Sequence, residues 1–292
     1  MTDDAKVAAL REQLPATGAG IYLDTATRGP LPVEVAAAMH EADDWELRVG
    51  RVWEGRDEDV AQRTEEARAV VAALIGAEPA NVVLTHGLTD ALELAQERQR
   101  GKGRIVDISN RACATPINVG ELDADAVVLA GDRWLLGPEA TGAMWLADAG
   151  ATAASRTLPR TALVGLARSV GWLEMYVGLE WIYERTAILA GRLFASLLAT
   201  EGIEVLTPRD DLVAIVSFRL ANWPADEAAE ELSRRAQAIV RPLTDLNAIR
   251  ASVGWFNTEA ELDRFAEAVA ELASYTPDTL PRRPSPIVLA DT

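Results

Sequence analysis

The feature that most constrains this chain is an apolar turn between two apolar runs, 125–129 and 143–146. The turn reads Ala130-Gly131-Asp132-Arg133-Trp134-Leu135-Leu136-Gly137-Pro138-Glu139-Ala140-Thr141-Gly142. Four of its residues are Gly or Pro, which predicts a tight connection between two strands. Trp and Leu at its centre are unusual in a solvated loop, so the turn is expected to pack over something. Two interpretations stay open: the floor of a functional site, or a buried corner of the sheet.

The composition indicates a globular protein with an acidic surface. Of the 292 residues, 49% are hydrophobic and 25% are charged, which is enough apolar material for one large domain or two moderate ones. The net charge is 28 − 45 = −17, and such a surface repels nucleic-acid phosphates and anionic lipids. No run is apolar enough to span a bilayer, and the acidic start is unlike a signal peptide. We therefore expect a cytoplasmic protein with no nucleic-acid or membrane partner.

The scarcity of three residue types argues against several kinds of site. Cys113 is the only cysteine, so neither an internal disulfide nor a cysteine-based zinc site is expected. His40 and His86 are the only histidines, which argues against a multi-histidine metal centre. Lys6 and Lys102 are the only lysines, so few side chains can offer an amine to a covalent reaction.

Hydrophobic periodicity predicts helices and strands in alternation. Helices are expected over 3–14, 33–48, 56–75, 90–100, 161–183 and 184–200 with a break at Gly178, 224–236 and 259–273. Strands are expected over 21–24, 81–85, 104–108, 125–129, 143–146, 203–206, 213–220, 238–241 and 249–253, with a loop at 149–154. Asn257 or Thr258 is expected to cap the last helix. The predicted organisation is an N-terminal helix in 1–20, a large α/β domain in 21–175, a small α/β domain in 176–275 and a Pro-rich, disordered tail in 276–292.

The apolar turn resembles the Schiff-base signature of the class V aminotransferases. These are fold-type-I pyridoxal-phosphate (PLP) enzymes, and they include cysteine desulfurases and isopenicillin-N-epimerase-like proteins. In the family, a turn of the form Gly-x-Lys-Trp-Leu-Leu-Gly-Pro-Glu-Gly-Thr-Gly carries the lysine that bonds to the cofactor. This chain has Arg133 at the lysine position and Ala140 at a glycine position, and it matches the signature elsewhere.

Three further segments resemble cofactor-binding motifs of the family. Thr85-His86-Gly87-Leu88-Thr89-Asp90-Ala91 is similar to the turn that grips the PLP phosphate, with Leu88 in place of a Thr or Ala. Asp107 and Asn110 resemble an Asp-x-Ala-Gln motif whose aspartate pairs with the pyridine nitrogen. Thr157 stands where a family threonine reaches a PLP phosphate, often across a dimer. From the residues alone, a capping or turn aspartate is the better interpretation of Asp107, and any strand-to-helix turn offers N–H groups to a phosphate.

Two segments resemble the parts of the family that contact substrate. Arg250-Ala251-Ser252 and Phe256-Asn257-Thr258 are similar to an Arg-x-Ser…Phe-Asn-Thr motif whose arginine binds the substrate carboxylate. The resemblance implies substrate-binding roles for Arg250 and Asn257. The alternative for Arg250 is a surface arginine at a strand edge. The segment 22–32 resembles the family's N-terminal stretch, which crosses near the active site.

The resemblance implies a truncated fold-type-I large domain followed by a small C-terminal α/β sandwich. Family members are longer, and the part missing here falls between residues 100 and 104. It holds strands 2, 3 and 4 of a sheet ordered 3-2-4-5-6-7-1, together with the aromatic or His side chain that stacks on the cofactor ring. Removing these strands leaves the contiguous order 5-6-7-1. The strand at 104–108 then becomes an edge that needs cover from a helix, a loop or a partner subunit.

Arg133 decides what chemistry is expected. A Schiff base needs an uncharged amine, and an arginine side chain stays protonated. We therefore expect a degenerate family member, a pseudoenzyme without covalent PLP chemistry. Arg133, Arg250 and Thr89 would bind a small anionic or amino-acid-like ligand, or the protein would act as a homodimer or with a full-length homologue. The alternative is an enzyme of altered mechanism that holds PLP non-covalently, with Asp107 as a base or pyridinium partner.

Overall fold

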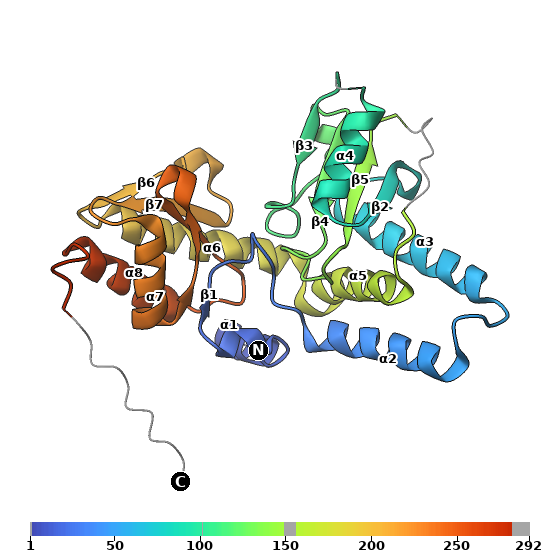
Figure 1. Ribbon diagram of the computed structural model, residues 1–292, viewed down its shortest axis with the longest axis horizontal. Coiled ribbons are helices and arrows are strands. Elements are labelled where there is room, and N and C mark those ends of the chain that lie inside the picture. The colour runs from blue at the N-terminus through green and yellow to red at the C-terminus, as the bar shows by residue number, and fades with distance from the viewer. Residues whose placement is uncertain (1, 101, 149–155, 282–292) are drawn as a thin grey trace, which may run out of the picture.

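Two lobes joined by a long helix make up the computed structural model, which describes residues 2–100, 102–148 and 156–281 (Figure 1). The loop expected at 149–154 and the end of the Pro-rich tail lie outside these residues. Among the residues described, no helix is both long enough and apolar enough to cross a membrane.

The large lobe contains a four-stranded sheet whose order confirms the predicted fold class. The order is β2-β5-β4-β3, and β5 runs antiparallel to both of its neighbours. In the family numbering this is 1-7-6-5, the order that remains once strands 2, 3 and 4 are removed. The bounds are β2 (Val82–Thr85), β3 (Ile105–Asp107), β4 (Ala126–Ala130) and β5 (Gly142–Leu146).

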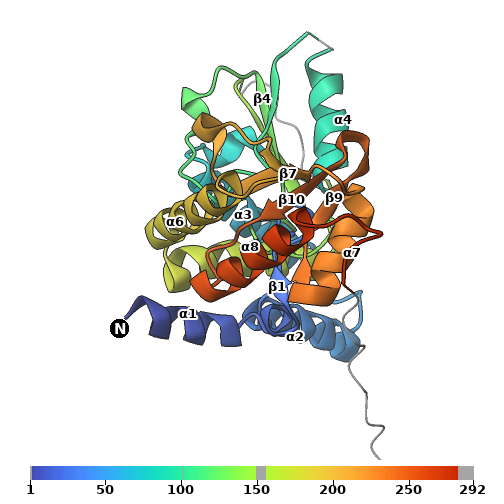
Figure 2. The ribbon, with the colours of Figure 1, turned by 90° about the vertical axis from the view of Figure 1, so that its left-hand side faces the viewer.

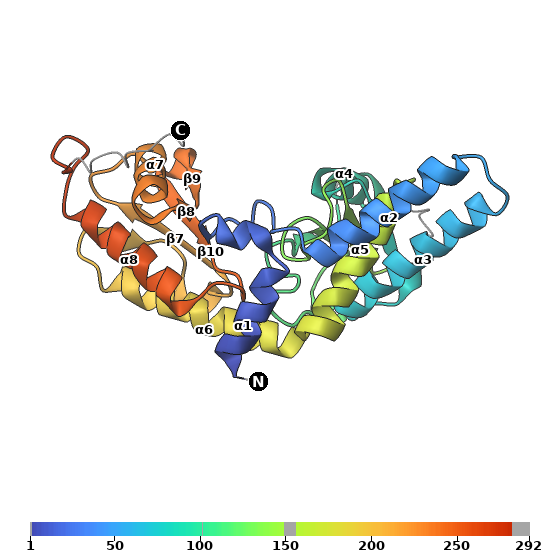
Figure 3. The same ribbon diagram turned by 90° about the horizontal axis from the view of Figure 1, so that it is seen from below.

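Helices cover both faces of this sheet, because successive strand residues point to opposite sides. Leu84 and Leu129 belong to the apolar layer shared with α3 and α5, whereas Val83 and Val128 belong to the layer shared with α4. α2 packs on α5 and forms an outer layer beside α3 (Figure 3). The bounds are α2 (Val33–Val49), α3 (Arg56–Leu74), α4 (Leu88–Arg98) and α5 (Arg160–Trp172).

The small lobe is a two-layer unit of one antiparallel sheet and three helices, as predicted (Figure 2). Val216, Phe218 and Leu220 of β7 are buried in the core that the helices share. Arg250 is paired with Ser217 and therefore lies on the opposite face of the sheet. The strand order is β6 (Ile203–Val205), β7 (Ile215–Leu220), β10 (Ala248–Ser252), β9 (Arg241–Leu243), and the helices are α6 (Leu179–Leu198), α7 (Ala225–Ala236) and α8 (Glu259–Ala273).

Two details of the small lobe bear on the predictions. Thr258 caps α8, and Glu261 completes a capping box with it, so this expectation is confirmed. The prediction of a single strand at 238–241 was wrong, because the chain changes its pairing partner strand at Val240. β8 (Ala238–Ile239) pairs in parallel with β1, and β9 pairs with β10.

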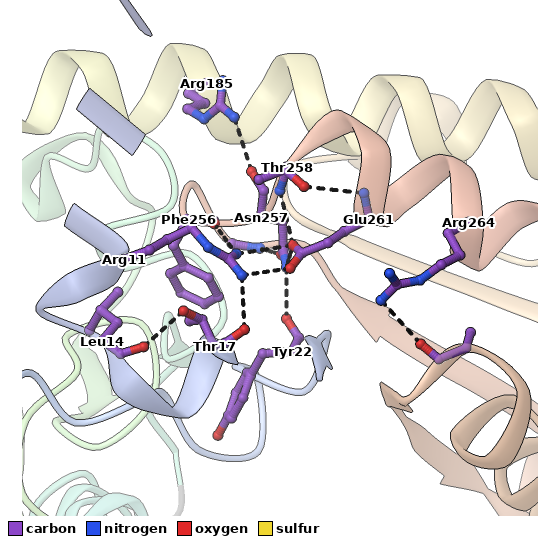
Figure 4. Close-up of polar contacts among 12 residues, drawn as sticks. Arg11, Leu14, Thr17, Tyr22, Arg185, Phe256, Asn257, Thr258, Glu261 and Arg264 are labelled. Atoms are coloured by element: carbon purple, nitrogen blue, oxygen red, sulfur yellow. Dashed lines mark hydrogen bonds and ion pairs between the residues drawn. The ribbon is translucent and has the colours of Figure 1, made fainter. Parts of the chain in front are cut away.

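The N-terminal segment ties the lobes together. α1 lies at their junction, and β1 pairs with β8 of the small lobe (Figure 3). The guanidinium of Arg11 lies 2.7 Å from Glu261 and donates to the carbonyl of Phe256 at 2.8 Å (Figure 4). Residues 24–32 then cross to the large lobe and lead into α2. The bounds are α1 (Asp3–Glu12) and β1 (Ile21–Tyr22).

The helical connection between the lobes breaks where the sequence predicted. After α5 the chain makes a π-helical stretch, Leu173–Val177, and then Gly178 takes a φ of 92°. α6 begins immediately after Gly178. Lys6 of α1 donates to the carbonyl of Val177 at 2.8 Å, so α1 supports this joint directly.

The first residues of the predicted tail are ordered, contrary to the expectation of disorder from Pro277 onward. Leu280 packs against the core of the small lobe. The carbonyl of Pro281 accepts a hydrogen bond of 2.8 Å from Arg235. Proline content alone did not reveal these tertiary contacts.

Candidate functional site

The predicted site residues of the large lobe lie along one end of its sheet, where the parallel strands terminate. β2, β3 and β4 are mutually parallel, so their carboxyl ends share an edge with the start of β5. Gly87 follows β2, Asp107 ends β3 and Arg133 follows β4. With strands spaced at about 4.8 Å, the ends of β2 and β3 are about 14 Å apart. Chain segments far apart in sequence therefore form one rim.

The apolar turn is a buried corner of the sheet, which is one of the two interpretations offered for it. Trp134, Leu135 and Leu136 are almost fully buried and pack in the core beneath the rim. Gly131 N–H donates to the Thr141 carbonyl, and Gly137 N–H donates to the Gly131 carbonyl. The turn is thus a buried corner of the sheet that holds the preceding two polar residues at the rim.

Arg133 projects from this turn and remains partly exposed. Its guanidinium donates to the Asn110 amide oxygen at 3.4 Å, and among the described residues it forms no ion pair. The loop of residues 24–32 crosses directly over its backbone. Gly29 N–H donates to the Asp132 carbonyl at 2.8 Å, and a Cβ on Gly29 would lie 2.2 Å from the Arg133 carbonyl oxygen.

Asp132 and Arg28 are site residues that the sequence did not single out. The guanidinium of Arg28 lies 3.1 Å from Glu139 and 3.9 Å from Asp132. Burial raises the pKa of the Asp132 carboxyl above its usual value, while Arg133 and Arg28 act in the opposite direction. Its position beside Arg133 in the turn was the one available signal.

Asp107 takes the local role that its position suggested. Its side chain is exposed, and its Oδ1 accepts a hydrogen bond of 2.8 Å from the N–H of Ser109. It forms no ion pair with Arg133 among the described residues. Asn110, three residues later, is the group that contacts Arg133. The Asp107–Asn110 segment therefore shapes the rim through a turn and one amide.

The helix start predicted to hold a phosphate is flanked by a carboxylate of the chain. Gly87 has a φ of 111°, and α4 starts at Leu88, with Thr89 exposed beside it. Asp90 accepts from the N–H of His86 at 2.9 Å and pairs with Arg156 at 3.2 Å.

Thr157 reaches this corner through its backbone. The His86 Nε2 lies 3.0 Å from the carbonyl of Thr157. The resemblance implied that the side chain of Thr157 would contact a phosphate, whereas the contact present here uses its main chain. The predicted Thr157 position is therefore next to the α4 start, close to Gly87 in space.

Arg250 is already paired with a carboxylate of the same chain. Its Nη2 lies 3.1 Å from Asp24 and 2.5 Å from the hydroxyl of Thr27, which itself donates to Asp24. The side chains of Arg250 and Asp24 are 19% and 17% exposed. The Nε of Arg250 is buried and has no hydrogen-bond partner. Asp24 is the residue that sequence reasoning missed here, although it lies in the segment predicted to cross the site.

Asn257 is committed to the packing of the small lobe. It is fully buried, its amide oxygen accepts from Gly254 N–H at 2.8 Å, and its amide nitrogen donates to the Tyr22 carbonyl at 3.2 Å (Figure 4). In this arrangement Asn257 presents no group to a ligand. We therefore leave it outside the site proposed below.

The two lysines lie away from the rim. Lys6 donates to Val177 and lies 4.0 Å from the centre of the Trp181 ring. Lys102 lies before the amino end of β3, whereas Asp107 is at its carboxyl end. The residues present therefore do not fit a covalently held PLP, because no amine stands at the end of β4.

Two other kinds of chemistry find no support in the described residues. Cys113 is buried, and burial raises the pKa of its thiol to about 12, so it remains a protonated, unreactive group. No cluster of three or more His, Cys, Asp or Glu side chains suited to a metal ion occurs in the part of the chain described.

Comparison with known proteins supports the family suggested by the motifs. Residues 21–104 match the family model described as aminotransferase class-V. No protein of curated function matches the sequence significantly. The family match covers the segment that crosses the site, the helix start at Leu88 and the chain up to β3.

Solved structures extend the likeness to most of the chain. A mutant of C-DES with glycine covalently linked to its PLP cofactor is 14% identical, with a TM-score of 0.76 over 89% of this chain and 98% of that one. The apo cysteine desulfurase of Thermococcus onnurineus NA1 is 17% identical, with a TM-score of 0.74 over 91% and 98%. The cysteine desulfurase CsdA of Escherichia coli is 19% identical, with a TM-score of 0.71 over 90% and 97%.

At these identities the structural matches establish the fold, while the sequence match establishes the family resemblance of the first third of the chain. The predicted resemblance to class V aminotransferases is therefore confirmed, in the fold of their cysteine-desulfurase-like members.

Proposed function

We propose that this protein is a class V aminotransferase-like protein that has no covalent PLP chemistry and binds a small anion at Arg133. One observation carries the proposal: an arginine without an ion-pair partner among the described residues stands at the rim position where the family has its lysine. A carboxylate or a phosphate ester is the class of ligand that a guanidinium fork suits.

The surroundings of Arg133 support an anion more than an amino acid. The Asn110 amide oxygen contacts the guanidinium at 3.4 Å without neutralising it, and the adjacent Asp132 acts on it electrostatically without forming an ion pair. The second arginine, Arg250, is occupied by Asp24, so the carboxylate of an amino acid would have to displace an internal ion pair. We therefore propose that an anionic ligand binds first to Arg133.

The test combines absorbance with chemical trapping. The wild-type protein is incubated with PLP and treated with borohydride, which fixes an imine to lysine irreversibly. We expect no trapped adduct in the wild type and a trapped adduct in Arg133→Lys. The matched control is Arg241→Lys, an exposed position of the small lobe. An adduct in the wild type, or equal labelling of both variants, would contradict the proposal.

A second measurement separates simple anion binding from the alternative of non-covalent PLP. Inorganic phosphate and PLP are titrated separately against wild type and Arg133→Ala while thermal unfolding is followed. Stabilisation by both ligands that is lost in Arg133→Ala supports an anion site. A PLP absorbance shift that borohydride leaves unchanged, and that Asp107→Asn abolishes, would favour the enzyme of altered mechanism.

We also propose that the protein pairs with a second copy or with a full-length homologue. The support is a set of exposed apolar side chains along α2 and the turn that follows it. Trp45 is 43% exposed, Leu47 82% and Val52 99%. Sedimentation of the wild type against Leu47→Glu/Val52→Glu tests this, and identical monomeric behaviour of both would contradict it.

A further inference from the structure

The outer edge of β3 is open in the described structure. Ala126 N–H donates to the Arg104 carbonyl, and Ile108 N–H donates to the Val128 carbonyl. In a parallel ladder this register turns Arg104, Val106 and Ile108 toward β4. The N–H and C=O groups of the alternate residues, Ile105 and Asp107, therefore point away from the sheet.

No described element covers this edge. β3 is at the end of the strand order, and its main packing partners are β4 on one side and α4 on one face. Ile105 and Val106 are partly exposed although both are hydrophobic. Open backbone groups next to half-buried apolar side chains are what an added strand pairs with.

A basic turn leads into the same edge. Arg98, Arg100, Lys102 and Arg104 are all exposed and have no acidic residue among them in the sequence. Arg104 pairs with Asp123, whereas the other three form no ion pair with any described residue. On a chain with a net charge of −17, this run is a local reversal of sign.

We propose that the β3 edge and the basic side chains beside it, Arg98, Arg100 and Lys102, form a docking surface for an acidic extended segment of another protein. The segment adds to the sheet as a strand beside β3, and its carboxylates lie against Arg98, Arg100 and Lys102. Backbone pairing supplies the hydrogen bonds, and the charges set the end at which the acidic residues lie.

The alternation along β3 sets the chemistry of the segment. Ile105 faces the layer shared with α4, and Val106 packs against the opposite layer. An added strand would continue both layers with apolar side chains at the paired positions. The basic side chains precede β3 in the chain, so the acidic residues of the segment are expected beside the amino end of β3.

The first experiment uses a labelled synthetic peptide with four alternating Val and Ile residues flanked on one side by four Glu, in both orders. Fluorescence anisotropy measures its affinity for the full-length protein. We expect binding that weakens steeply with salt. A peptide with four Lys in place of Glu should bind at least ten-fold more weakly. Equal binding of the two peptides, or none of the acidic one, would overturn the proposal.

Variants of the protein then separate pairing from charge. Ile105→Pro removes an outward N–H that does not bond to β4. The variant should bind the acidic peptide at least ten-fold more weakly. R98E/R100E/K102E should also bind the acidic peptide at least ten-fold more weakly. R48E/R209E/R241E makes an equal charge change at exposed sites elsewhere and should have little effect. If Ile105→Pro binds normally, the peptide is held by charge alone and the strand model fails.

Amide hydrogen exchange on the wild type gives a test that needs no variant. Peptide binding should protect the amides of Ile105 and Asp107 while leaving that of Val106, already bonded to β4, unchanged. The same peptide N-methylated at alternate residues should protect neither. Protection spread evenly over the basic turn, without the alternation in β3, would overturn strand addition.

Discussion

Two arginines of this protein occupy positions that the family resemblance connects with ligands, yet their surroundings differ. Arg250, on the face of the small sheet opposite its helices, is held by Asp24 and Thr27. Arg133, at the rim of the large sheet, touches an uncharged amide and forms no ion pair among the described residues. A match to a family motif is therefore a weaker guide than the neighbouring charges to whether an arginine has an ion-pair partner within the chain. The residue that matches the family is paired with a carboxylate of the chain, whereas the residue that departs from it has no ion-pair partner among the described residues.

The loop of residues 24–32 connects the two regions. It carries Asp24 and Thr27 at one end and rests on the backbone of Arg133 through Gly29 at the other. Substitutions along this path therefore show whether the two arginines behave independently.

The largest effect is expected from Gly29→Ala, which should lower the free energy of unfolding by about 3 kcal/mol through steric overlap. A Cβ there would lie 2.2 Å from the Arg133 carbonyl oxygen and 2.3 Å from Leu136 Cδ2. Denaturant unfolding measures this loss of stability. Gly18→Ala is the matched control, because its Cβ would meet nothing within 4 Å. Equal stability of the two variants would mean that the loop does not rest on the turn.

Asp24→Ala should lower the free energy of unfolding by about 2 kcal/mol, because it leaves the partly buried Arg250 without its carboxylate partner. Asp24→Asn keeps the shape and part of the hydrogen bonding, so a smaller loss is expected. A double-mutant cycle with Arg250→Ala isolates the coupling. Strictly additive losses would show that this pair does not neutralise Arg250, and the comparison with Arg133 would then be lost.

Asp132→Asn should stabilise the protein by about 0.5 kcal/mol at neutral pH. Burial raises the pKa of the folded Asp132 carboxyl, so the folded state carries a charge penalty above the ordinary pKa of an aspartate. The penalty disappears as pH falls below that ordinary value, where both states are protonated. Unfolding of wild type and variant across this pH range should therefore converge in acid. A gain that persists unchanged at low pH would rule out this electrostatic origin.

The smallest effect on stability is expected from Arg133→Ala, within about 0.5 kcal/mol, because an unpaired, partly exposed side chain contributes little. The same substitution should abolish phosphate binding measured by calorimetry. Arg250→Ala, in contrast, should destabilise the fold and leave phosphate binding intact. The reverse pattern would assign the anion site to the small lobe.

Local pattern fixed most of the elements. Periodicity located the helices and strands, glycine chemistry located the break at Gly178, and the residue types of Asn257 and Thr258 narrowed the cap of α8 to these two positions, of which the structure uses Thr258. The order of the four-stranded sheet followed from the family resemblance. These features depend on residues near one another in the sequence, or on a known topology.

Tertiary structure alone decided which charges meet. Asp24 and Arg250 are 226 residues apart, and neither shows in its own surroundings that it will be neutralised by the other. The segment after β1 reaches β10 directly, since the Ser252 N–H donates to the Leu23 carbonyl at 2.7 Å and Asp24 forms an isolated bridge with Ser252. The buried Asn257 likewise donates to the carbonyl of Tyr22. In contrast, the sequence by itself determined that Arg133 cannot form an imine, since that depends on the permanent charge of a guanidinium. Whether a carboxylate of the chain pairs with Arg133 depends on distances that only the folded chain defines.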